Sequence, residues 1–229
     1  MGPGGGLRGE AVSLRDAAVA YSGFGRPAIC GVTLSIGLGR YVVVTGPNGA
    51  GKTTLIEACL GLLKPVRGSV KLLGVDTRSR GLARVRRLCG YVPQGFMRPP
   101  HDHYTARQVI SMGLAPLGRG GSEGVGEVAE ALGIKPLLER PVGTLSGGEQ
   151  QKVFIARAMV RRPLVLFLDE PFASLDRASR EAVAHALGDY VKRAGASVVV
   201  VTHDTMPVSS LADAVVKMEG GRVVSVEGL

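Results

Sequence analysis

The sequence contains no tryptophan, and aromatic residues make up only 4% of it. Its three cysteines, Cys30, Cys59 and Cys89, lie far apart and form no Cys-x-x-Cys pair. An odd number of scattered cysteines argues against a disulfide framework. We therefore expect a reducing compartment, such as the cytoplasm, and we expect all three cysteines to be small buried apolar residues.

Long hydrophobic runs are also absent. The longest apolar stretches, such as residues 164–168, cover only a few residues, whereas a membrane-spanning helix needs about 20. Residues 1–6 lack the apolar core of a secretory signal peptide. We therefore expect no membrane span in the chain itself.

The remaining composition is that of an ordinary globular protein. The 229 residues are 45% hydrophobic and 21% charged, which is enough for a buried core in one large domain. The net charge of +9 would suit nucleic acid, phosphate ligands or an anionic membrane surface. Charge alone does not choose among these partners.

Short apolar runs alternate with helical patterns along the chain. Three unbroken, largely β-branched runs predict strands of a parallel sheet that is covered on both faces, at residues 41–45, 164–168 and 198–202. Between the last two runs, apolar residues at helical spacing predict a helix that ends at Gly195. Strand, helix and strand in this order form a βαβ unit, so we expect an α/β core.

Two other regions have different patterns. The half-alternating runs at 12–14, 32–36 and 69–73 predict an antiparallel sheet at the edge of the core. Residues 105–160 read mainly as helix, with segments at 105–112, 125–132 and 147–160 and a glycine-rich gap at 118–122. The predicted fold is therefore a mainly parallel α/β core with an antiparallel β edge and a helical insertion.

Residues 46–53 read GPNGAGKT, which matches the phosphate-binding pattern G-x-x-x-x-G-K-[ST] between a predicted strand and a predicted helix. Glycines let the backbone N–H groups turn toward phosphate oxygens, and the helix N-terminus adds its positive dipole. We expect Lys52 to bind the β- and γ-phosphates and Thr53 to bind Mg²⁺. The predicted nucleotide contacts are Gly46, Asn48, Gly49, Ala50, Gly51, Lys52, Thr53 and Thr54.

Two acidic residues follow the second buried strand. At this position Asp169 can hold Mg²⁺, and Glu170 can act as the base that polarises the water attacking the γ-phosphate. Solvated carboxylates at a strand end are the alternative. Next to a P-loop, we favour the catalytic roles.

Residues 145–150 read LSGGEQ, which matches the signature sequence of ABC-type ATPases. With this motif, the chain resembles an ABC transporter nucleotide-binding subunit over nearly its whole length. The segments 91–94, 105–113 and 169–173 are most similar to the zinc and manganese uptake group, although residues 113–145 are shorter and richer in glycine than in that group. The resemblance implies an adenine contact at Tyr21, a γ-phosphate and Mg²⁺ contact at Gln94, a γ-phosphate contact at His203, and contacts to a partner's ATP at Ser146, Gly147, Gly148 and Asp176.

Several of these residues also have a local explanation. Ser146 with Glu149 forms a capping box, and Asp176 can cap the next helix. Tyr21 could be an ordinary strand aromatic, and His203 a satisfied core histidine. Glycines at a helix start, such as Gly147 and Gly148, are costly unless a ligand approaches the backbone closely.

The resemblance implies one ATPase domain, with a core lobe at about 1–94 and 161–229 and a helical lobe at about 95–160. Two copies, or this chain and a paralogous subunit, would close around two ATP and Mg²⁺ and drive separate transmembrane permease subunits. We expect the permease contact around Gln94 and residues 96–99, at the inner face of the cell membrane. The transported cargo could be a metal ion.

Two rival functions stay open from the sequence. One is a soluble ABC ATPase of iron–sulfur cluster assembly, and the other is a nucleic-acid repair ATPase. We expect no nucleic-acid partner, because the chain has no room for a long coiled coil or a second ATPase domain. The cluster His101–His103 could bind metal but suits a solvated loop better. The basic run 84–87 is a solvated face or a contact to an anionic membrane or acidic loop.

Overall fold

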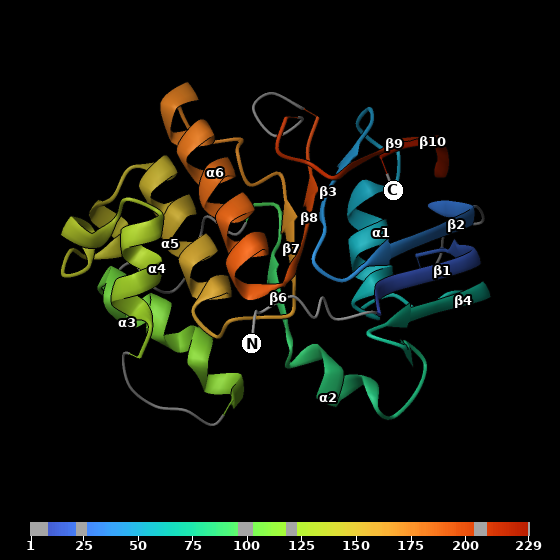
Figure 1. The fold of residues 1–229 in the computed structure, drawn as a ribbon, viewed down its shortest axis with the longest axis horizontal. Helices are drawn as coiled ribbons and strands as arrows, with labels where there is room; N and C mark the ends of the chain where they lie inside the picture. The colour runs from blue at the N-terminus through green and yellow to red at the C-terminus, as the bar shows by residue number, and fades with distance from the viewer. Residues whose placement is uncertain (1–8, 22–26, 96–102, 118–122, 204–209, 229) are drawn as a thin grey trace, which may run out of the picture.

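The computed structural model describes residues 9–21, 27–95, 103–117, 123–203 and 210–228. Two sheets and a group of helices build the molecule (Figure 1). The strands are β1 (Glu10–Val19), β2 (Ile29–Gly37), β3 (Tyr41–Thr45), β4 (Arg67–Leu72), β5 (Val75–Asp76), β6 (Cys89–Val92), β7 (Val165–Asp169), β8 (Ser197–Val201), β9 (Ala214–Glu219) and β10 (Arg222–Glu227). The α-helices are α1 (Lys52–Cys59), α2 (Leu82–Arg86), α3 (Ala106–Ser111), α4 (Val125–Ala131), α5 (Gly147–Met159) and α6 (Arg177–Ala194), and 3₁₀ turns cover Met112–Leu117, Lys135–Leu137 and Val142–Thr144.

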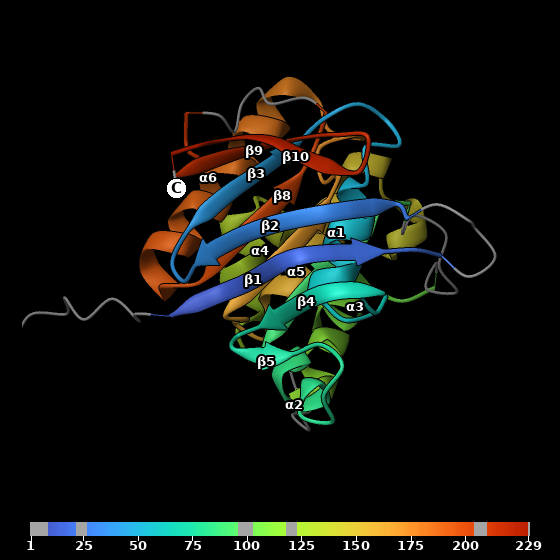
Figure 2. The same ribbon diagram turned by 90° about the vertical axis from the view of Figure 1, so that its right-hand side faces the viewer.

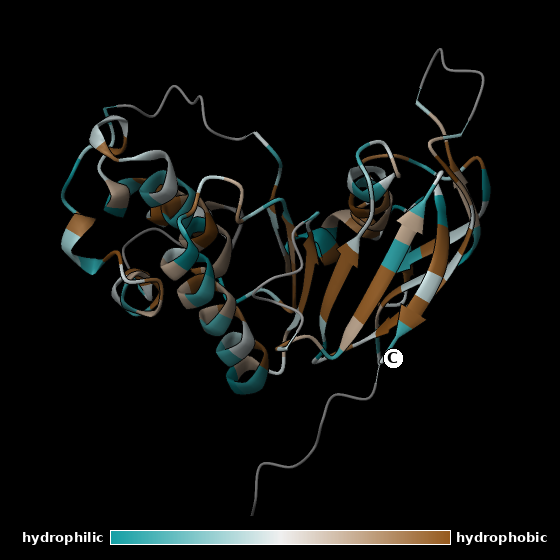
Figure 3. Ribbon diagram, turned by 90° about the horizontal axis from the view of Figure 1, so that it is seen from above, coloured by the Kyte–Doolittle hydropathy of each residue, from teal (hydrophilic) through white to brown (hydrophobic). Residues whose placement is uncertain are grey.

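A six-stranded sheet forms the centre, in the order β10-β9-β3-β8-β7-β6. Its strands run parallel except for the antiparallel β9–β10 pair. The predicted parallel core is thereby confirmed, with β7 and β8 each displaced by one residue from the predicted runs. Figure 3 shows these hydrophobic strands between the helices on one side and the remaining strands on the other.

The central strands are apolar throughout because their two faces pack into different cores. Val43 of β3 packs with the helices α3 to α6, whereas its neighbours Val42 and Val44 pack with α1 and the second sheet. Successive side chains of a strand point to opposite faces. A strand that is covered on both faces therefore shows no polar alternation.

The second sheet has the order β2-β1-β4-β5, and its described pairs are antiparallel. Figure 2 shows this sheet crossing in front of α1. Strands β1, β2 and β4 overlap the predicted runs at 12–14, 32–36 and 69–73, so the antiparallel edge is confirmed. The short strand β5 lies outside these runs and was not predicted.

The helices α3, α4 and α5 lie together on the far side of the central sheet from β1 and β2 (Figure 1). They coincide with the three predicted helical segments. The long helix α6 buries Val183, Leu187 and Val191 and ends at Gly195 in the left-handed conformation, as predicted. Among the described helices, none is long and apolar enough to cross a membrane.

The cysteine prediction is partly wrong. Cys59 and Cys89 are buried, but Cys30 is only half-buried. Cys30 lies on β2, where an Arg222 Nη2 of β10 lies 3.9 Å from its Sγ.

Candidate functional site

The loop after β3 needs glycine at two positions. Gly46 has φ +153°, and a Cβ on it would collide with the carbonyl oxygen of Met218. Gly51 has φ +94°, and its Cβ would come within 2.7 Å of Ile29 Cγ2. Because residues other than glycine rarely adopt such backbone conformations, these glycines determine the path of the loop into α1.

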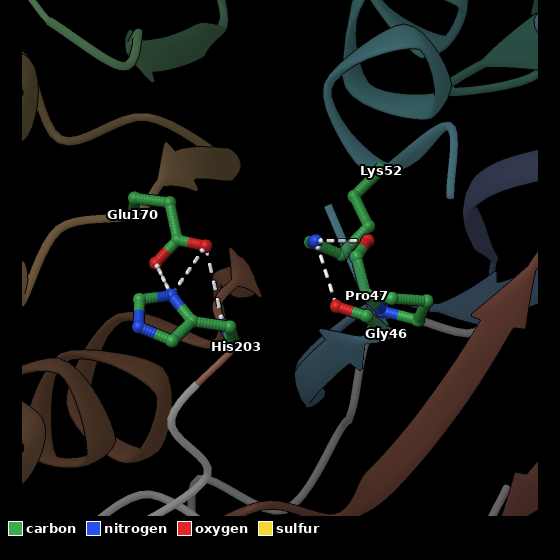
Figure 4. A network of polar contacts seen from close by, with 5 residues as sticks. All are labelled: Gly46, Pro47, Lys52, Glu170 and His203. Atoms are coloured by element: carbon green, nitrogen blue, oxygen red, sulfur yellow. Dashed lines mark hydrogen bonds and ion pairs between the residues drawn. The ribbon is translucent and has the colours of Figure 1, made fainter. Parts of the chain in front are cut away.

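Lys52 is the first residue of α1, and its side chain curls back over the loop. Its Nζ donates hydrogen bonds to the carbonyl oxygens of Gly46 at 2.8 Å and Pro47 at 3.0 Å (Figure 4). Lys52 is only 7% exposed. The loop carbonyls therefore hold the ammonium group beside the N-terminus of α1, where a bound anion would contact it.

Asp169 is the last residue of β7 and is 1% exposed. Neither of its carboxylate oxygens has a hydrogen-bond partner of good geometry in the described part of the chain, although the Thr53 hydroxyl lies close enough to favour the charged form. Burial raises the pKa of Asp169 and the charge of Glu170 adds to the rise, while the Thr53 hydroxyl and the Lys52 ammonium oppose it. A buried carboxylate without a partner, beside the Thr53 hydroxyl, is a ligand pair that suits Mg²⁺.

Glu170 turns toward His203 and away from Lys52 (Figure 4). Both of its carboxylate oxygens lie 3.0 Å from His203 Nδ1, and the His203 backbone N–H donates to Oε1 at 3.2 Å. The Glu170 side chain is 9% exposed and that of His203 is 64% exposed. His203 is thus not a core histidine, and its exposed ring orients the Glu170 carboxylate.

One cavity of about 430 Å³ brings most of the predicted site together. Gln94, at the turn that follows β6, is part of its wall. Ten predicted site residues line the cavity with Ala28, namely Tyr21, Asn48, Gly49, Gly51, Lys52, Thr53, Thr54, Gln94, Asp169 and Glu170. Of the other predicted phosphate contacts, Gly46 accepts from Lys52 and Ala50 is buried.

The signature segment lies at a different place. Ser146 is the N-cap of α5, and its capping box with Glu149 is formed. Asp176 caps α6 by accepting from the Ser179 backbone N–H at 2.9 Å. A second cavity of about 360 Å³ is lined by Ser146, Gly148 and Asp176, among others, and shares no residue with the first.

Gly148 also has a reason within the chain. A Cβ on it would lie 3.0 Å from the Ser174 carbonyl oxygen, which is tighter than ordinary contacts. Close packing of α5 against the segment before α6 therefore explains this glycine without a ligand. Its predicted contact to a partner's ATP stays a prediction, as does that of Gly147.

Other predicted features lie partly outside the described residues. The segment 96–99 and residues 101 and 102 are among them. Within the described chain, no group of three histidine, cysteine, aspartate or glutamate residues could hold a metal. In the basic run, Arg84 and Arg87 are exposed, while Arg86 is half-buried.

One residue beside this site, Glu57, was not predicted from the sequence. Its carboxylate accepts a hydrogen bond from the Tyr21 hydroxyl at 2.8 Å. Glu57 lies three residues after Thr54 on α1, so the two side chains share a helix face. The Thr54–Glu57 spacing could have indicated that Glu57 lies on the same helix face as the site. The contact with Tyr21 could not be predicted, because the two residues lie 36 positions apart in the sequence.

The geometry defines a nucleotide-binding P-loop domain with a separate signature segment. The chain matches the sequence profile of the ABC transporter family over residues 29–173, which is more than half of its length. The chain therefore belongs to the ABC transporter family, as its ATP-binding domain.

Named relatives and solved structures agree with this assignment. The chain is 35% identical to the zinc import ATP-binding protein of Halorhodospira halophila over 93% of this chain and 75% of the relative. It is 38% identical to the molybdate/tungstate import ATP-binding protein of Pyrococcus horikoshii over 85% of this chain. A dimeric structure of a bacterial ABC transporter cassette superposes with a TM-score of 0.83 and 28% identity, covering 95% of this chain and 98% of the other.

The chain is shorter than several of these relatives. It spans 56% of the molybdate/tungstate import protein and 54% of an sn-glycerol-3-phosphate import ATP-binding protein of Rhizobium johnstonii, to which it is 35% identical over 87% of its own length. A component of the cbiONQ transporter complex of Clostridium perfringens also shares the fold, with a TM-score of 0.83, 28% identity and coverage of 96% and 89%.

Proposed function

We propose that this chain is the ATP-hydrolysing subunit of an ABC transporter. The observation that carries the proposal is the 430 Å³ cavity, in which the glycine loop, two strand-end acids, Gln94 and Tyr21 line one space. A phosphate cradle beside a metal-binding acid and a base is the arrangement that phosphoryl transfer to water requires.

In this proposal, the loop and the start of α1 bind the triphosphate. Backbone N–H groups of Gly49, Gly51 and Thr53 donate hydrogen bonds to the phosphate oxygens, and the positive end of the helix dipole adds to the attraction. Lys52 exchanges the carbonyl oxygens of Gly46 and Pro47 for phosphate oxygens, which are better partners because they are charged. Tyr21, at the rim, meets the adenine ring.

Asp169, Thr53 and Gln94 are the residues that would hold Mg²⁺. The fit rests on the two buried Asp169 oxygens without a hydrogen-bond partner and on the exposed Gln94 amide at the same cavity. Bound there, Mg²⁺ neutralises charge on the phosphate oxygens.

Glu170 is the proposed base. It accepts the proton of a water that attacks the γ-phosphorus, so that the P–O bond to the leaving ADP breaks as the new bond forms. His203 holds this carboxylate through Nδ1, and its side chain stays largely exposed. We propose that this exposed ring contacts the γ-phosphate when ATP is bound.

The proposed active form has two chains. Ser146, Gly148 and Asp176 line a second cavity that shares no residue with the first, so we assign these residues, together with Gly147, to ATP that is bound by another chain. The partner is a second copy or a paralogous subunit. Within each chain, residues 1–94 and 161–229 form the ATP-binding lobe, and residues 95–160 form the lobe that carries the signature helix.

We further propose that the dimer drives separate transmembrane permease subunits at the inner face of the cell membrane. Because one relative is a zinc import ATP-binding protein, we propose that the transporter imports its cargo and that the cargo is a metal ion. Other relatives are named for molybdate/tungstate and glycerol-3-phosphate. Co-purification with a permease, followed by metal-ion uptake into vesicles, tests this part of the proposal.

The Glu170→Gln variant tests the catalytic assignment. The amide keeps the shape of the side chain but loses the basic oxygen, so ATP binding should persist while turnover falls by about 10²-fold or more. Phosphate release and calorimetric ATP affinity are measured in parallel. Glu181→Gln, an exposed residue on α6 that pairs with Arg177, serves as the matched control. Hydrolysis at the wild-type rate in Glu170→Gln would remove this residue from the catalytic role.

A further inference from the structure

Tyr21 is tied to α1 at its hydroxyl end. It is the second residue after the end of β1 and is 39% exposed. Its hydroxyl donates to Glu57 Oε2 at 2.8 Å and lies 3.1 Å from Thr54 Oγ1. The ring is therefore held at its tip, while its exposed part faces the cavity that it lines.

Glu57 reaches the wall of the cavity through its hydrogen bond with Tyr21, and its charge also raises the pKa of Asp169. Tyr21 and Thr54 line the cavity, whereas Glu57 does not. The helix that carries Glu57 begins at Lys52, the phosphate-binding lysine of the proposed site. One short helix thus fixes both the phosphate cradle and the position of the aromatic ring, and so sets the separation between them.

We propose that Glu57 is a positioning residue that holds the Tyr21 ring in place for the base of the nucleotide. The inference rests on the proposed function, in which Tyr21 meets adenine and the loop binds phosphates. If Glu57 has this role, the site binds a nucleotide more tightly than a bare polyphosphate, and the difference in affinity depends on the Tyr21–Glu57 hydrogen bond.

The physical reason is preorganisation. A tyrosine side chain without this hydrogen bond loses rotamer freedom when a ligand immobilises it, and that loss of entropy weakens binding. A hydrogen bond to a carboxylate is strong enough to fix the ring before the ligand arrives. Burial, together with Glu57, raises the pKa of Tyr21, while Thr54 lowers it, so the phenol remains a donor at neutral pH.

Two variants of Glu57 separate the hydrogen bond from the charge. Glu57→Gln and Glu57→Ala both remove the negative charge, but only Gln keeps an oxygen that can accept from Tyr21. Calorimetry with Mg-ATP and with Mg-tripolyphosphate measures both affinities. We expect Glu57→Ala to bind ATP about three- to fivefold more weakly than Glu57→Gln, which corresponds to part of one hydrogen bond. The two variants should bind tripolyphosphate equally.

Tyr21 variants complete the cycle. Tyr21→Phe keeps the ring and removes the donor, so it should lower ATP affinity by a similar factor and leave tripolyphosphate unchanged. In the Tyr21→Phe background, Glu57→Gln and Glu57→Ala should bind ATP equally, because the coupling between the two positions is lost.

The outcomes separate this inference from the proposed function. Equal ATP affinities for Glu57→Gln and Glu57→Ala, tighter ATP binding by Glu57→Ala, or parallel losses for both ligands would each overturn the positioning role. Tyr21→Ala tests the base contact itself: an unchanged ratio of ATP to tripolyphosphate affinity would refute the adenine assignment of Tyr21. Failure of the wild-type chain to bind either ligand would refute the phosphate cradle.

Discussion

At the scale of single residues, Asp169 is the residue of the site that lowers the stability of the ligand-free fold. Its carboxylate is buried, and in the described chain neither oxygen accepts a hydrogen bond of good geometry, so the nearby Thr53 hydroxyl offsets the cost of burial only in part. A buried charge without partners destabilises the fold by more than a buried neutral group does. The raised pKa of Asp169 expresses the same cost. We infer that stability is given up here so that a cation can be bound.

This cost has a definite pH dependence. Because the folded-state pKa lies above the unfolded value of about 3.9, the destabilisation is absent below that value. It grows as the pH rises and is complete above the folded pKa. At any pH above the folded-state pKa, the folded protein therefore carries the full cost unless Mg²⁺ offsets it.

Asp169→Asn should consequently stabilise the protein when nucleotide and metal are absent. We expect a gain on the order of 1 kcal/mol in the free energy of unfolding at pH 7.5, because the amide carries no charge. The gain should shrink toward pH 4. Mg-ATP should raise the melting temperature of the wild-type chain far more than that of the variant.

Urea unfolding and thermal melts measure both effects. Asp189→Asn, at an exposed position of α6, makes the same chemical change away from the site and should alter neither quantity. A ligand-free Asp169→Asn variant less stable than the wild type would show that Asp169 makes a stabilising contact, and would contradict this account.

At the scale of elements, the part of the chain that the structure describes contains two capping boxes of the same kind. Ser146 with Glu149 begins α5, and Thr105 with Gln108 begins α3. Each satisfies backbone N–H groups that a helix start leaves free. The Ser146 backbone and hydroxyl donate to Glu149 and hold its pKa below the usual range, so this contribution to stability is lost as the pH falls through that lowered pKa.

The two caps allow a matched comparison. Ser146→Ala and Thr105→Ala should each cost about 1 kcal/mol of stability. Only Ser146 is proposed to contact a partner's ATP, so only Ser146→Ala should lose hydrolysis beyond its loss of folded protein, while ATP binding stays intact. ATPase rates normalised to the folded fraction decide this. Equal normalised rates for the two variants would reduce Ser146 to a helix cap.

How much of the fold the sequence predicts differs among the elements. The helix α6 was predictable because its apolar spacing and its terminal Gly195 both reflect local rules. The strand β6 was not, because it is short and contains Gly90, which packing requires: a Cβ there would lie 2.6 Å from Leu166 Cδ1. The hairpin of β9 and β10 turns at Gly220 and Gly221, a local signal that went unused.

The candidate site divides in the same way. The glycine loop was predictable because Gly46 and Gly51 adopt conformations that only glycine accepts readily. The Tyr21–Glu57 hydrogen bond joins residues 36 positions apart, and no local pattern encodes that contact. Residues of a site that act through local backbone geometry can be predicted, whereas those that act through tertiary contacts require the structure.

At the scale of the whole molecule, the central claim is that the functional unit is composite. The phosphate cavity and the signature cavity have no residue in common. A single chain would then bind ATP but supply only part of the groups that stabilise the transition state. ATP would join two chains, and its hydrolysis would separate them.

A crosslink between two different chains tests this claim most directly. One chain carries Asn48→Cys and the other Ser146→Cys, both at exposed positions. Asn48 is preferred to Gly49, whose φ of +79° disfavours a side chain. Both chains also carry Cys30→Ser, since Cys30 is only half-buried, and Glu170→Gln to retain ATP.

A short bifunctional thiol reagent is added to the mixture with and without Mg-ATP, and the products are separated by mass. The account predicts a crosslinked dimer of the two different chains that forms only with Mg-ATP, and no such product when either variant is treated alone. Absence of that dimer, together with a crosslink inside one chain that carries both cysteines, would contradict it.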